Sequence, residues 1–477
     1  MSCRITRRSF VKRMGVAGVA VPMFLPSILR AQTSSKVLNV GFVATGGRAG
    51  AHVGFCKTAG LNCVAFAEVD KNAWKAVLEH DPWKKAAGYT DWRKMFEKHA
   101  KELDVVFVAT PDHSHFAPTM TAVSMGINCY TEKPLTWSVR EAQLLSQAYL
   151  KNPKVVTQMG NQGHAGQGWR IAYEYIKGGA IGDVVEFHTW TNRPIWPQGG
   201  GRPPQDWEMP APANLDWESW IGPAPMRPYA EFPGKEEGGD KGKKKNRKGV
   251  YNPFNWRGFV DFGSGALGDM ACHTTDGIYA IMQPGYAETG EPLFQTAPVG
   301  DQWQAGMIFK MTFRATKDRP GFATFWYEGK DKEGKRLFPP VPEELKADKR
   351  ELPSTGNLII GTKGKMLVEG DYWNSPFLLP EAKRREFGKP KQLLERSPGH
   401  HEEFIAACRG EKPREFSQSN FGYSGPMAAN IQLGNLAARA GKKLVLDESG
   451  KIVNDPAIND LAWREPRSGW GPLEMKV

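Results

Sequence analysis

The sequence has few cysteines, and their spacing suits neither a metal site nor a redox pair. The six are Cys3, Cys56, Cys63, Cys129, Cys272 and Cys408, with no C-x-x-C pair among them. This spacing argues against a zinc site and against a disulfide framework. We therefore expect no metal site, and we expect the five cysteines after the first to be small apolar residues of the interior.

Long apolar runs are also missing. No stretch approaches the roughly 18 apolar residues of a membrane-spanning helix, so we predict no membrane span. Residues 1–32 are instead typical of a twin-arginine export signal. Thr6 to Lys12 reads TRRSFVK, a short apolar core follows from Val16 to Leu25, and Ala31 suits cleavage. We expect an exported, periplasmic protein; the alternative is a chance arginine pair in a basic N-terminus.

No basic stripe is interleaved with aromatic residues, although the net charge is +12. Six of the positive residues precede Gln32, and another basic block runs from Lys241 to Lys248. The rest of the chain is close to neutral, so nucleic acid is not a predicted partner. We interpret residues 234–249, GKEEGGDKGKKKNRKG, as a flexible low-complexity loop, with a clamp for an anionic polymer as the alternative.

The stretch from Leu38 to Asp70 has the order of a dinucleotide-binding βαβ unit. An apolar run to Val43 predicts a buried strand, and a glycine-rich turn should then open a helix. A second apolar run, Cys63 to Ala67, is followed by Glu68 and Asp70. A carboxylate at Glu68 lies where it can accept hydrogen bonds from an adenosine ribose, and its charge favours NAD over NADP.

The glycine-rich turn is a degenerate form of G-x-G-x-x-G. Gly46 matches the central glycine, whereas Ala44 and Ala49 occupy the outer positions. Gly46 would let the backbone approach a pyrophosphate, which the N–H groups and dipole of the next helix favour. A plain surface turn is the alternative. We predict that Thr45, Gly47 and Arg48 also contact the cofactor, and Arg48 could offset the preference for NAD by pairing with a 2′-phosphate.

Strands and helices continue to alternate to about residue 160, which predicts a doubly wound Rossmann domain over residues 36–160. The apolar run Asp104 to Ala109 reads as a parallel strand buried on both faces. Thr110 and Pro111 follow it, at the end of a strand where ligands bind in such sheets. Residues 161–446 would form a second domain, and residues 447–477 a C-terminal tail.

Lys133 is the strongest catalytic candidate. It stands in Glu132-Lys133-Pro134, directly after the predicted strand Asn128 to Thr131. Pro134 restricts the preceding residue to an extended geometry, which would hold the ammonium at the edge of the sheet. There it could hydrogen-bond a substrate hydroxyl and lower its pKa as hydride leaves. An exposed Lys-Pro turn is the alternative.

Asp269 and His273 form a second candidate pair. They are four residues apart, so on a helix they share one face, and the carboxylate would set the imidazole tautomer. His273 would then serve as general base toward an alcohol. A helix cap beside a packed histidine is the alternative reading.

A third group of polar residues follows the predicted Rossmann domain. The segment Gln158 to His164, QMGNQGH, joins the two domains, and its amides could reach ribose or sugar hydroxyls. We assign Asn161 to the cofactor. The predicted substrate residues are Gln162, His164, Arg170, Arg193, Trp256 and Asp276.

Together these clusters resemble the Gfo/Idh/MocA family, the group of glucose–fructose oxidoreductase and inositol dehydrogenase. The resemblance is to the exported branch with Gln-Met-Gly-Asn-Gln and a later Gly-His-His-Glu-Glu-Phe, here Gly399 to Phe404. It depends on Gly46-Gly47-Arg48, Ala109-Thr110-Pro111 with His115, Glu132-Lys133-Pro134, and Gly268-Asp269 with His273 and Asp276.

The resemblance implies a Rossmann domain followed by an α/β domain with a large, mainly antiparallel sheet whose open face often forms an oligomer interface. It implies NAD, with NADP less favoured, and a homo-oligomer. By analogy Lys133 contacts nicotinamide and substrate, and Asp269 and His273 contact the reacting hydroxyl. The expected activity is oxidation of a sugar or glycoside, at C3 of a pyranose. The alternative is a redox-neutral glycoside hydrolase that works by oxidation, elimination and reduction.

Overall fold

The structure is a computed structural model that describes residues 37–233, 249–297 and 300–477. The predicted export signal, residues 1–32, lies outside the described residues. So does the predicted loop 234–249, except for Gly249.

The first part of the described chain, up to Met159, forms a six-stranded sheet in which every pair of neighbours is parallel. The strand order is β3-β2-β1-β4-β5-β6, so the sheet extends in both directions from β1 and β4. This arrangement confirms the predicted doubly wound Rossmann sheet. The strands are β1 (Asn39–Val43), β2 (Asn62–Ala67), β3 (Ala87–Tyr89), β4 (Val105–Val108), β5 (Asn128–Thr131) and β6 (Thr157–Met159).

Helices connect these strands. Helix α3 is short, because a 3₁₀ turn over Lys71–Ala73, capped by the Asp70 side chain, precedes it. Ser138 and Glu141 form a capping box at the start of α6. The helices are α2 (Ala49–Thr58), α3 (Lys75–Leu78), α4 (Trp92–His99), α5 (Phe116–Ser124) and α6 (Val139–Lys151).

The rest of the chain contains an eight-stranded sheet of order β15-β14-β13-β7-β12-β11-β10-β16. Its pairs are antiparallel except β7 with β12, which confirms the mainly antiparallel sheet. Strands β13 and β14 form a hairpin, because the chain reverses between Gly361 and Gly364. The strands are β7 (Val184–Trp190), β10 (Thr289–Gln295), β11 (Gly306–Phe313), β12 (Phe322–Gly329), β13 (Gly356–Gly361), β14 (Gly364–Glu369), β15 (Ser375–Leu379) and β16 (Leu444–Val445).

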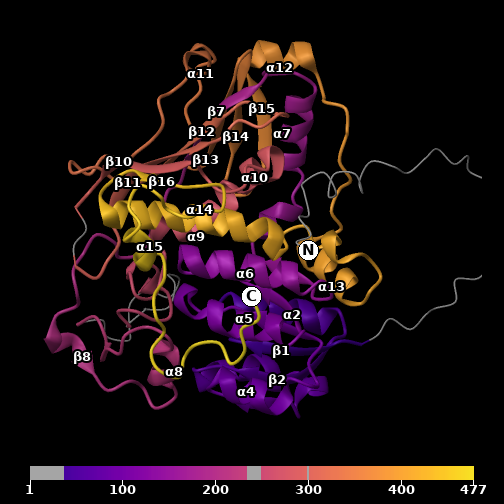
Figure 1. Cartoon of the computed structure of the whole chain (residues 1–477), viewed down its shortest axis with the longest axis vertical. Helices are drawn as coiled ribbons and strands as arrows, with labels where there is room; N and C mark the ends of the chain where they lie inside the picture. The colour runs from indigo at the N-terminus through magenta and orange to yellow at the C-terminus, as the bar shows by residue number, and fades with distance from the viewer. Residues whose placement is uncertain (1–36, 234–248, 298–299) are drawn as a thin grey trace, which may run out of the picture. The chain divides into compact units, whose positions relative to one another are not determined.

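Helix α14 runs between the larger sheet and α6 (Figure 1). A Cβ on Gly425 of α14 would lie 2.7 Å from the Ser146 Cβ of α6, so this glycine permits the close approach. Phe404 and Ile405 of α13 join the core of the first sheet, so this late helix packs against it. The helices of this second part are α7 (Gly168–Lys177), α8 (Trp217–Ile221), α9 (Gly265–Thr274), α10 (Asp276–Met282), α11 (Glu343–Ala347), α12 (Glu381–Phe387), α13 (His400–Cys408), α14 (Phe421–Ala440) and α15 (Ile458–Leu461).

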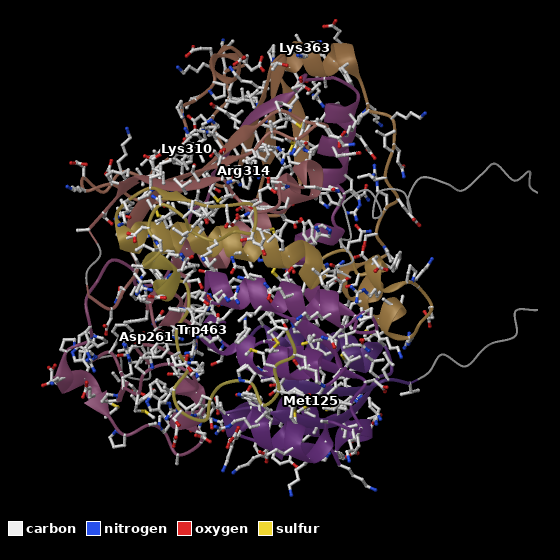
Figure 2. All side chains as sticks on the ribbon, in the orientation of Figure 1. Met125, Asp261, Lys310, Arg314, Lys363 and Trp463 are labelled. Atoms are coloured by element: carbon white, nitrogen blue, oxygen red, sulfur yellow. The ribbon has the colours of Figure 1, made fainter. Side chains whose placement is uncertain are left out.

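Between β7 and α9 the chain makes a long excursion that contains α8 and the two-residue strands β8 (Glu208–Met209) and β9 (Tyr229–Ala230). Its described part has an aromatic core of its own, with Trp220, Tyr251 and Phe262 among its members. The C-terminal segment lies against it: Arg464 donates to the Asp261 carbonyl over 2.9 Å, and Trp463 appears beside Asp261 in Figure 2. Among the described residues, no helix is both long and apolar enough to cross a membrane.

Two helical glycines should respond in opposite ways to substitution by alanine. A Cβ on Gly168 would stand 1.3 Å from the Trp373 carbonyl oxygen, whereas one on the exposed Gly54 would meet nothing within 4 Å. Gly168→Ala should therefore lower the free energy of unfolding by at least ~2 kcal/mol. Gly54→Ala should raise it by about 0.5–1 kcal/mol. Urea unfolding measures both, and a Gly168→Ala protein as stable as the unsubstituted one would contradict the packing.

Candidate dinucleotide and substrate site

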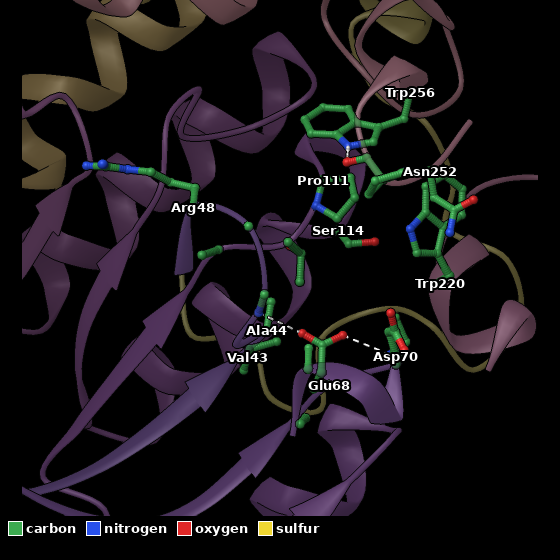
Figure 3. Close-up of a pocket in the computed structure, with 18 of the residues that line it drawn as sticks. Val43, Ala44, Arg48, Glu68, Asp70, Pro111, Ser114, Trp220, Asn252 and Trp256 are labelled. Atoms are coloured by element: carbon green, nitrogen blue, oxygen red, sulfur yellow. Dashed lines mark hydrogen bonds between the residues drawn. The ribbon is translucent and has the colours of Figure 1, made fainter. Parts of the chain in front are cut away.

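A cavity of about 550 Å³ lies at the carboxyl edge of the six-stranded sheet (Figure 3). Because β2, β1, β4 and β5 are neighbours in the sheet, the residues that follow them meet along one edge. Ten of the predicted site residues line this cavity. They are Gly46, Gly47, Arg48, Glu68, Asp70, Thr110, Pro111, Glu132, Lys133 and Trp256.

The glycine-rich turn adopts the backbone that the fingerprint requires, even where the residue differs. Ala44 has a φ of 80°, so it takes the left-handed region in place of the usual first glycine. Gly47 has a φ of 55° and Ala49 begins α2. A Cβ on Gly46 would lie 3.4 Å or more from its neighbours. Packing within the chain therefore does not demand a glycine at Gly46, and approach by a ligand from the cavity is a reason for one.

Glu68 holds this turn in place. One carboxylate oxygen accepts the N–H groups of Thr45 at 2.8 Å and Gly46 at 3.0 Å, and the other accepts the N–H of Asp70 at 2.9 Å. A carboxylate has about four lone-pair positions. The Thr45 hydroxyl lies 3.4 Å from the first oxygen but has a shorter bond, 3.1 Å, to the Ala73 carbonyl. With its one proton donated there, roughly one lone-pair position of Glu68 remains for a ribose hydroxyl.

Lys133 is held by a carboxylate from the second half of the chain. Its Nζ donates to the Asp269 carbonyl and to Asp269 Oδ1, both over 2.9 Å, and Arg257 Nε donates to the same Oδ1 over 2.9 Å. Burial alone lowers the pKa of Lys133, but the Asp269 carboxylate outweighs it, and the pKa is raised overall. The ammonium has three N–H groups; two are used, and one is left for a ligand.

Glu132 forms a separate ion cluster beside Lys133. Arg48 Nε lies 2.9 Å and His52 Nε2 3.0 Å from its Oε1. Burial raises the pKa of Glu132, but these partners lower it well below its usual value. Only Nε of Arg48 is bonded to Glu132, so the pairing of Arg48 with a 2′-phosphate stays a prediction. Arg48 points away from Glu68 (Figure 3) because Glu132, at the end of β5, holds it.

His273 lies beside the cavity and outside its lining. Asp269 and His273 are both on α9, yet Asp269 is bonded to Lys133 and Arg257 and does not set the imidazole tautomer as predicted. His273 Nδ1 is buried and lacks a hydrogen-bond partner among the described residues, and the ring contacts Tyr372 edge-on at 4.8 Å. Burial, with help from the nearby Lys133 charge, lowers the pKa of His273 to about 3, so the ring is neutral near pH 7.

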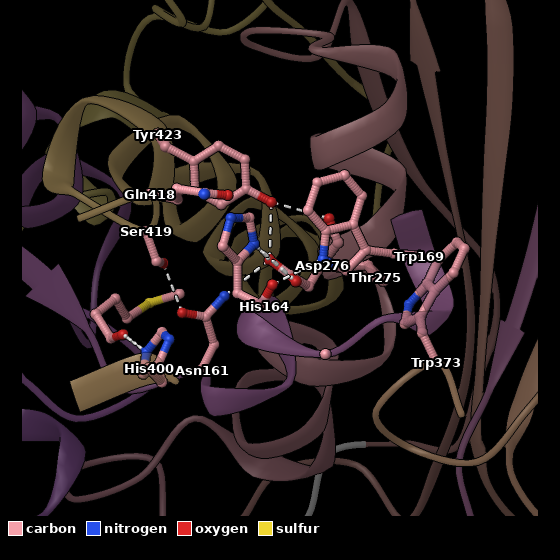
Figure 4. A network of polar contacts seen from close by, with 12 residues as sticks. Asn161, His164, Trp169, Thr275, Asp276, Trp373, His400, Gln418, Ser419 and Tyr423 are labelled. Carbon is pink, nitrogen blue, oxygen red and sulfur yellow. Dashed lines mark hydrogen bonds and ion pairs between the residues drawn. The ribbon is translucent and has the colours of Figure 1, made fainter. Parts of the chain in front are cut away.

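Three further predicted residues form a network away from the cavity (Figure 4). Asp276 accepts hydrogen bonds from Asn161 Nδ2 at 2.8 Å and Tyr423 OH at 2.7 Å, and His164 Nδ1 lies 3.0 Å away. Ser419 donates to the remaining amide oxygen of Asn161 over 2.6 Å. These bonds position the segment after β6, and the predicted ligand contacts of the three residues stay predictions.

The other predicted residues also lie outside the cavity lining. Arg170 donates to the carbonyls of His164 and Gly166, Arg193 is paired with Asn192, and His115 bridges the carbonyls of Pro134 and Thr110. Gln162 Oε1 is buried without a hydrogen-bond partner among the described residues. The sequence reasoning missed several residues that do line the cavity, namely Trp92, Leu215, Trp220, Asn252, Phe254 and Arg257.

These residues fit a dinucleotide. The N–H groups of Gly47 and Arg48 at the N-terminus of α2 suit a pyrophosphate, and Glu68 and Asp70 stand where a ribose is held. The fold and the cavity thus define a Rossmann protein with a cavity across the strand ends.

Comparison with known proteins identifies this domain. Residues 38–159 match the Gfo/Idh/MocA family model, described as an oxidoreductase family with an NAD-binding Rossmann fold. This part of the chain is therefore similar to the NAD-binding Rossmann domains of that family, in agreement with its six-stranded parallel sheet.

The curated relatives align over part of their length. A levoglucosan dehydrogenase of Pseudarthrobacter phenanthrenivorans is 27% identical over 27% of this chain and 29% of the relative. An inositol 2-dehydrogenase/D-chiro-inositol 3-dehydrogenase of Lacticaseibacillus casei is 28% identical over 31% of this chain and 42% of the relative. The alignments thus cover less than half of either relative.

Solved structures show the same fold over most of the chain. The WlbA dehydrogenase from Chromobacterium violaceum, in complex with NADH and UDP-GlcNAcA, has a TM-score of 0.56 and 17% identity. The likeness covers 89% of this chain and 99% of that one. At this identity the likeness establishes the fold, which includes the second, mixed sheet.

Removing the charge of Asp269 should make Lys133 more nucleophilic. In Asp269→Asn the pKa of Lys133 should fall. Burial and the Arg257 charge both lower this pKa, and the Asp269 carboxylate that raises it is then missing. A drop of one pKa unit gives about tenfold more neutral amine near pH 8. Labelling with acetic anhydride, read by peptide mass spectrometry, should therefore speed up at Lys133 by about tenfold. Asp276→Asn is the matched control, and equal rates in both variants would contradict the pairing.

Proposed function

We propose that the protein is an NAD-dependent oxidoreductase that acts on a hydroxyl of a sugar or glycoside, at C3 of a pyranose ring. The observation that carries this proposal is the Lys133 ammonium, fixed by Asp269 at the strand-end cavity with one N–H left to donate. The names of the relatives, levoglucosan dehydrogenase and inositol dehydrogenase, support a cyclic polyol as substrate class.

Residues of this chain would bind the oxygen of the reacting hydroxyl and accept its proton. A bound NAD would supply the hydride acceptor. Lys133 would donate its free N–H to the substrate oxygen and stabilise the charge that develops there as the C–H bond breaks. His273, neutral near pH 7, would take the hydroxyl proton on its unprotonated ring nitrogen. Arg257 would keep Asp269 ionised and in place.

A redox-neutral glycoside hydrolase is the second candidate. The twin-arginine pattern in residues 1–32 supports this second activity. From that pattern we propose that the protein is exported to the periplasm, where soluble NAD is not recycled. Transient oxidation at C3 would acidify the C2 proton, elimination would release the aglycone, water would add, and the same cofactor would reduce the ketone again. As in the family it resembles, we also propose a homo-oligomer.

Substitution of the two groups at the reacting hydroxyl tests the proposed chemistry. Lys133→Ala and His273→Ala should each lower turnover at least ~100-fold, because acid–base groups contribute on that scale. The readout is product formation from a panel of sugars and nitrophenyl glycosides, with folding checked by circular dichroism. Lys151→Ala, at the end of α6 and outside the cavity lining, is the control. Full activity in both variants would refute the assignment.

Deuterated water separates the two candidate activities. The purified protein is incubated with nitrophenyl glycosides and no added NAD. A free sugar with deuterium at C2 and no 3-keto group would show elimination and hydrolysis, whereas a 3-keto product that keeps its aglycone would show a dehydrogenase. If the protein binds a dinucleotide but forms neither product from any glycoside, both candidate activities would be contradicted.

A further inference from the structure

The cavity has a second wall that does not belong to the Rossmann domain. Residues 214–222 and 252–257 of the excursion between β7 and α9 face the strand ends, and we refer to them as the roof. Figure 3 shows Trp220 and Trp256 across the cavity from Ala44 and Glu68. Leu215, Trp220 and Phe254 line the cavity from this side.

The roof is fastened to the end of β2, beside the carboxylates that would hold a ribose. Lys71 N donates to the Asn214 carbonyl over 2.9 Å, and Asp216 N donates to the Val69 carbonyl over 2.9 Å. The Asn214 amide also donates to Asp70 Oδ1 over 2.7 Å. These bonds hold the first part of the roof directly above the turn that follows β2.

Two further attachments hold the roof elsewhere. The His113 ring, after β4, lies with Nε2 3.2 Å from the Trp220 carbonyl and 3.1 Å from the Ile221 carbonyl. Arg467 of the C-terminal segment donates to the Gly222 carbonyl over 3.0 Å. At the opposite end of the cavity, Arg257 pairs with Asp269 at 2.9 Å.

The roof also has internal rigidity. Trp220 stacks on Trp217 with ring centroids 4.6 Å apart and packs with Phe262 in the core of the excursion. Asp216 caps α8 by accepting the N–H of Ser219 over 3.0 Å. The roof is thus a built part of the fold that encloses the cavity from the side opposite the sheet.

The geometry points to a cofactor that is retained. The roof covers the adenosine half of a bound NAD, and Trp220 and Leu215 are further binding residues. NAD therefore leaves and enters slowly compared with turnover. This inference rests on the proposed function. A dinucleotide held between Glu68 and Trp220 exchanges only if the roof separates from β2, which breaks the bonds to Val69, Asp70 and Lys71. Stacking of an aromatic ring on a base contributes about 1–3 kcal/mol, which corresponds to about 5- to 150-fold in affinity.

Isotope exchange measures retention without any substrate. The full chain is saturated with NAD, desalted, and incubated with NAD that carries a heavy-isotope label. Samples are then denatured at successive times, and mass spectrometry gives the fraction of the released NAD that carries the label. We expect slow exchange in the unsubstituted protein and at least ~10-fold faster exchange in Trp220→Ala. Leu215→Ala removes a smaller side chain from the roof and should also raise the exchange rate. It replaces Trp220→Ala as the test variant if Trp220→Ala does not fold.

Trp207→Ala is the matched control, since Trp207 packs on the same aromatic core but does not line the cavity. It should leave the exchange rate unchanged. Retention is refuted if the unsubstituted protein exchanges its NAD within seconds, or if the roof variants exchange no faster than Trp207→Ala. In both cases the proposed oxidoreductase would stand, whereas a chain that binds no dinucleotide at all would remove the proposed function as well.

Discussion

The site depends on a buried ammonium that must be paired. Lys133 lies at the carboxyl edge of the first sheet, where burial disfavours its charge, and Asp269 from α9 supplies the compensating carboxylate. An unpaired buried charge would be strongly destabilising, so the pair forms only when both halves of the chain are folded together. Arg257 completes the cluster from the excursion. The two sheets are therefore joined at the point where the chemistry is proposed to occur.

Two other carboxylates at the edge of the sheet, Glu68 and Glu132, bind different groups. Glu68 satisfies the N–H groups of the glycine-rich turn, which keeps Ala44 and Gly47 in the left-handed backbone. Glu132 neutralises Arg48 and contacts the buried His52. Because each anion has its own partners, the last N–H of Lys133 is free to recognise a ligand. This division keeps the cavity preorganised and limits reorganisation during the reaction.

Much of this could be predicted from the sequence, and the failures have physical causes. Apolar runs located β1, β2, β4 and β5, because parallel strands buried on both faces are continuous apolar runs, whereas the short, half-buried β3 has no such run. Spacing placed Asp269 and His273 on one helix, but spacing cannot say which of several nearby cations a carboxylate pairs with. The roof was missed since Trp220 and Arg257 lie in an irregular, proline-rich excursion whose path depends on tertiary hydrogen bonds to β2 and His113.

A crystal structure of the protein with bound NAD would test the central claim most directly. The account predicts a dinucleotide that lies along the strand ends, with its pyrophosphate at Gly46 and Gly47, its adenosine under Trp220, and its nicotinamide within contact distance of the Lys133 ammonium. A cofactor bound outside this cavity, or one whose nicotinamide is directed away from Lys133, would contradict it.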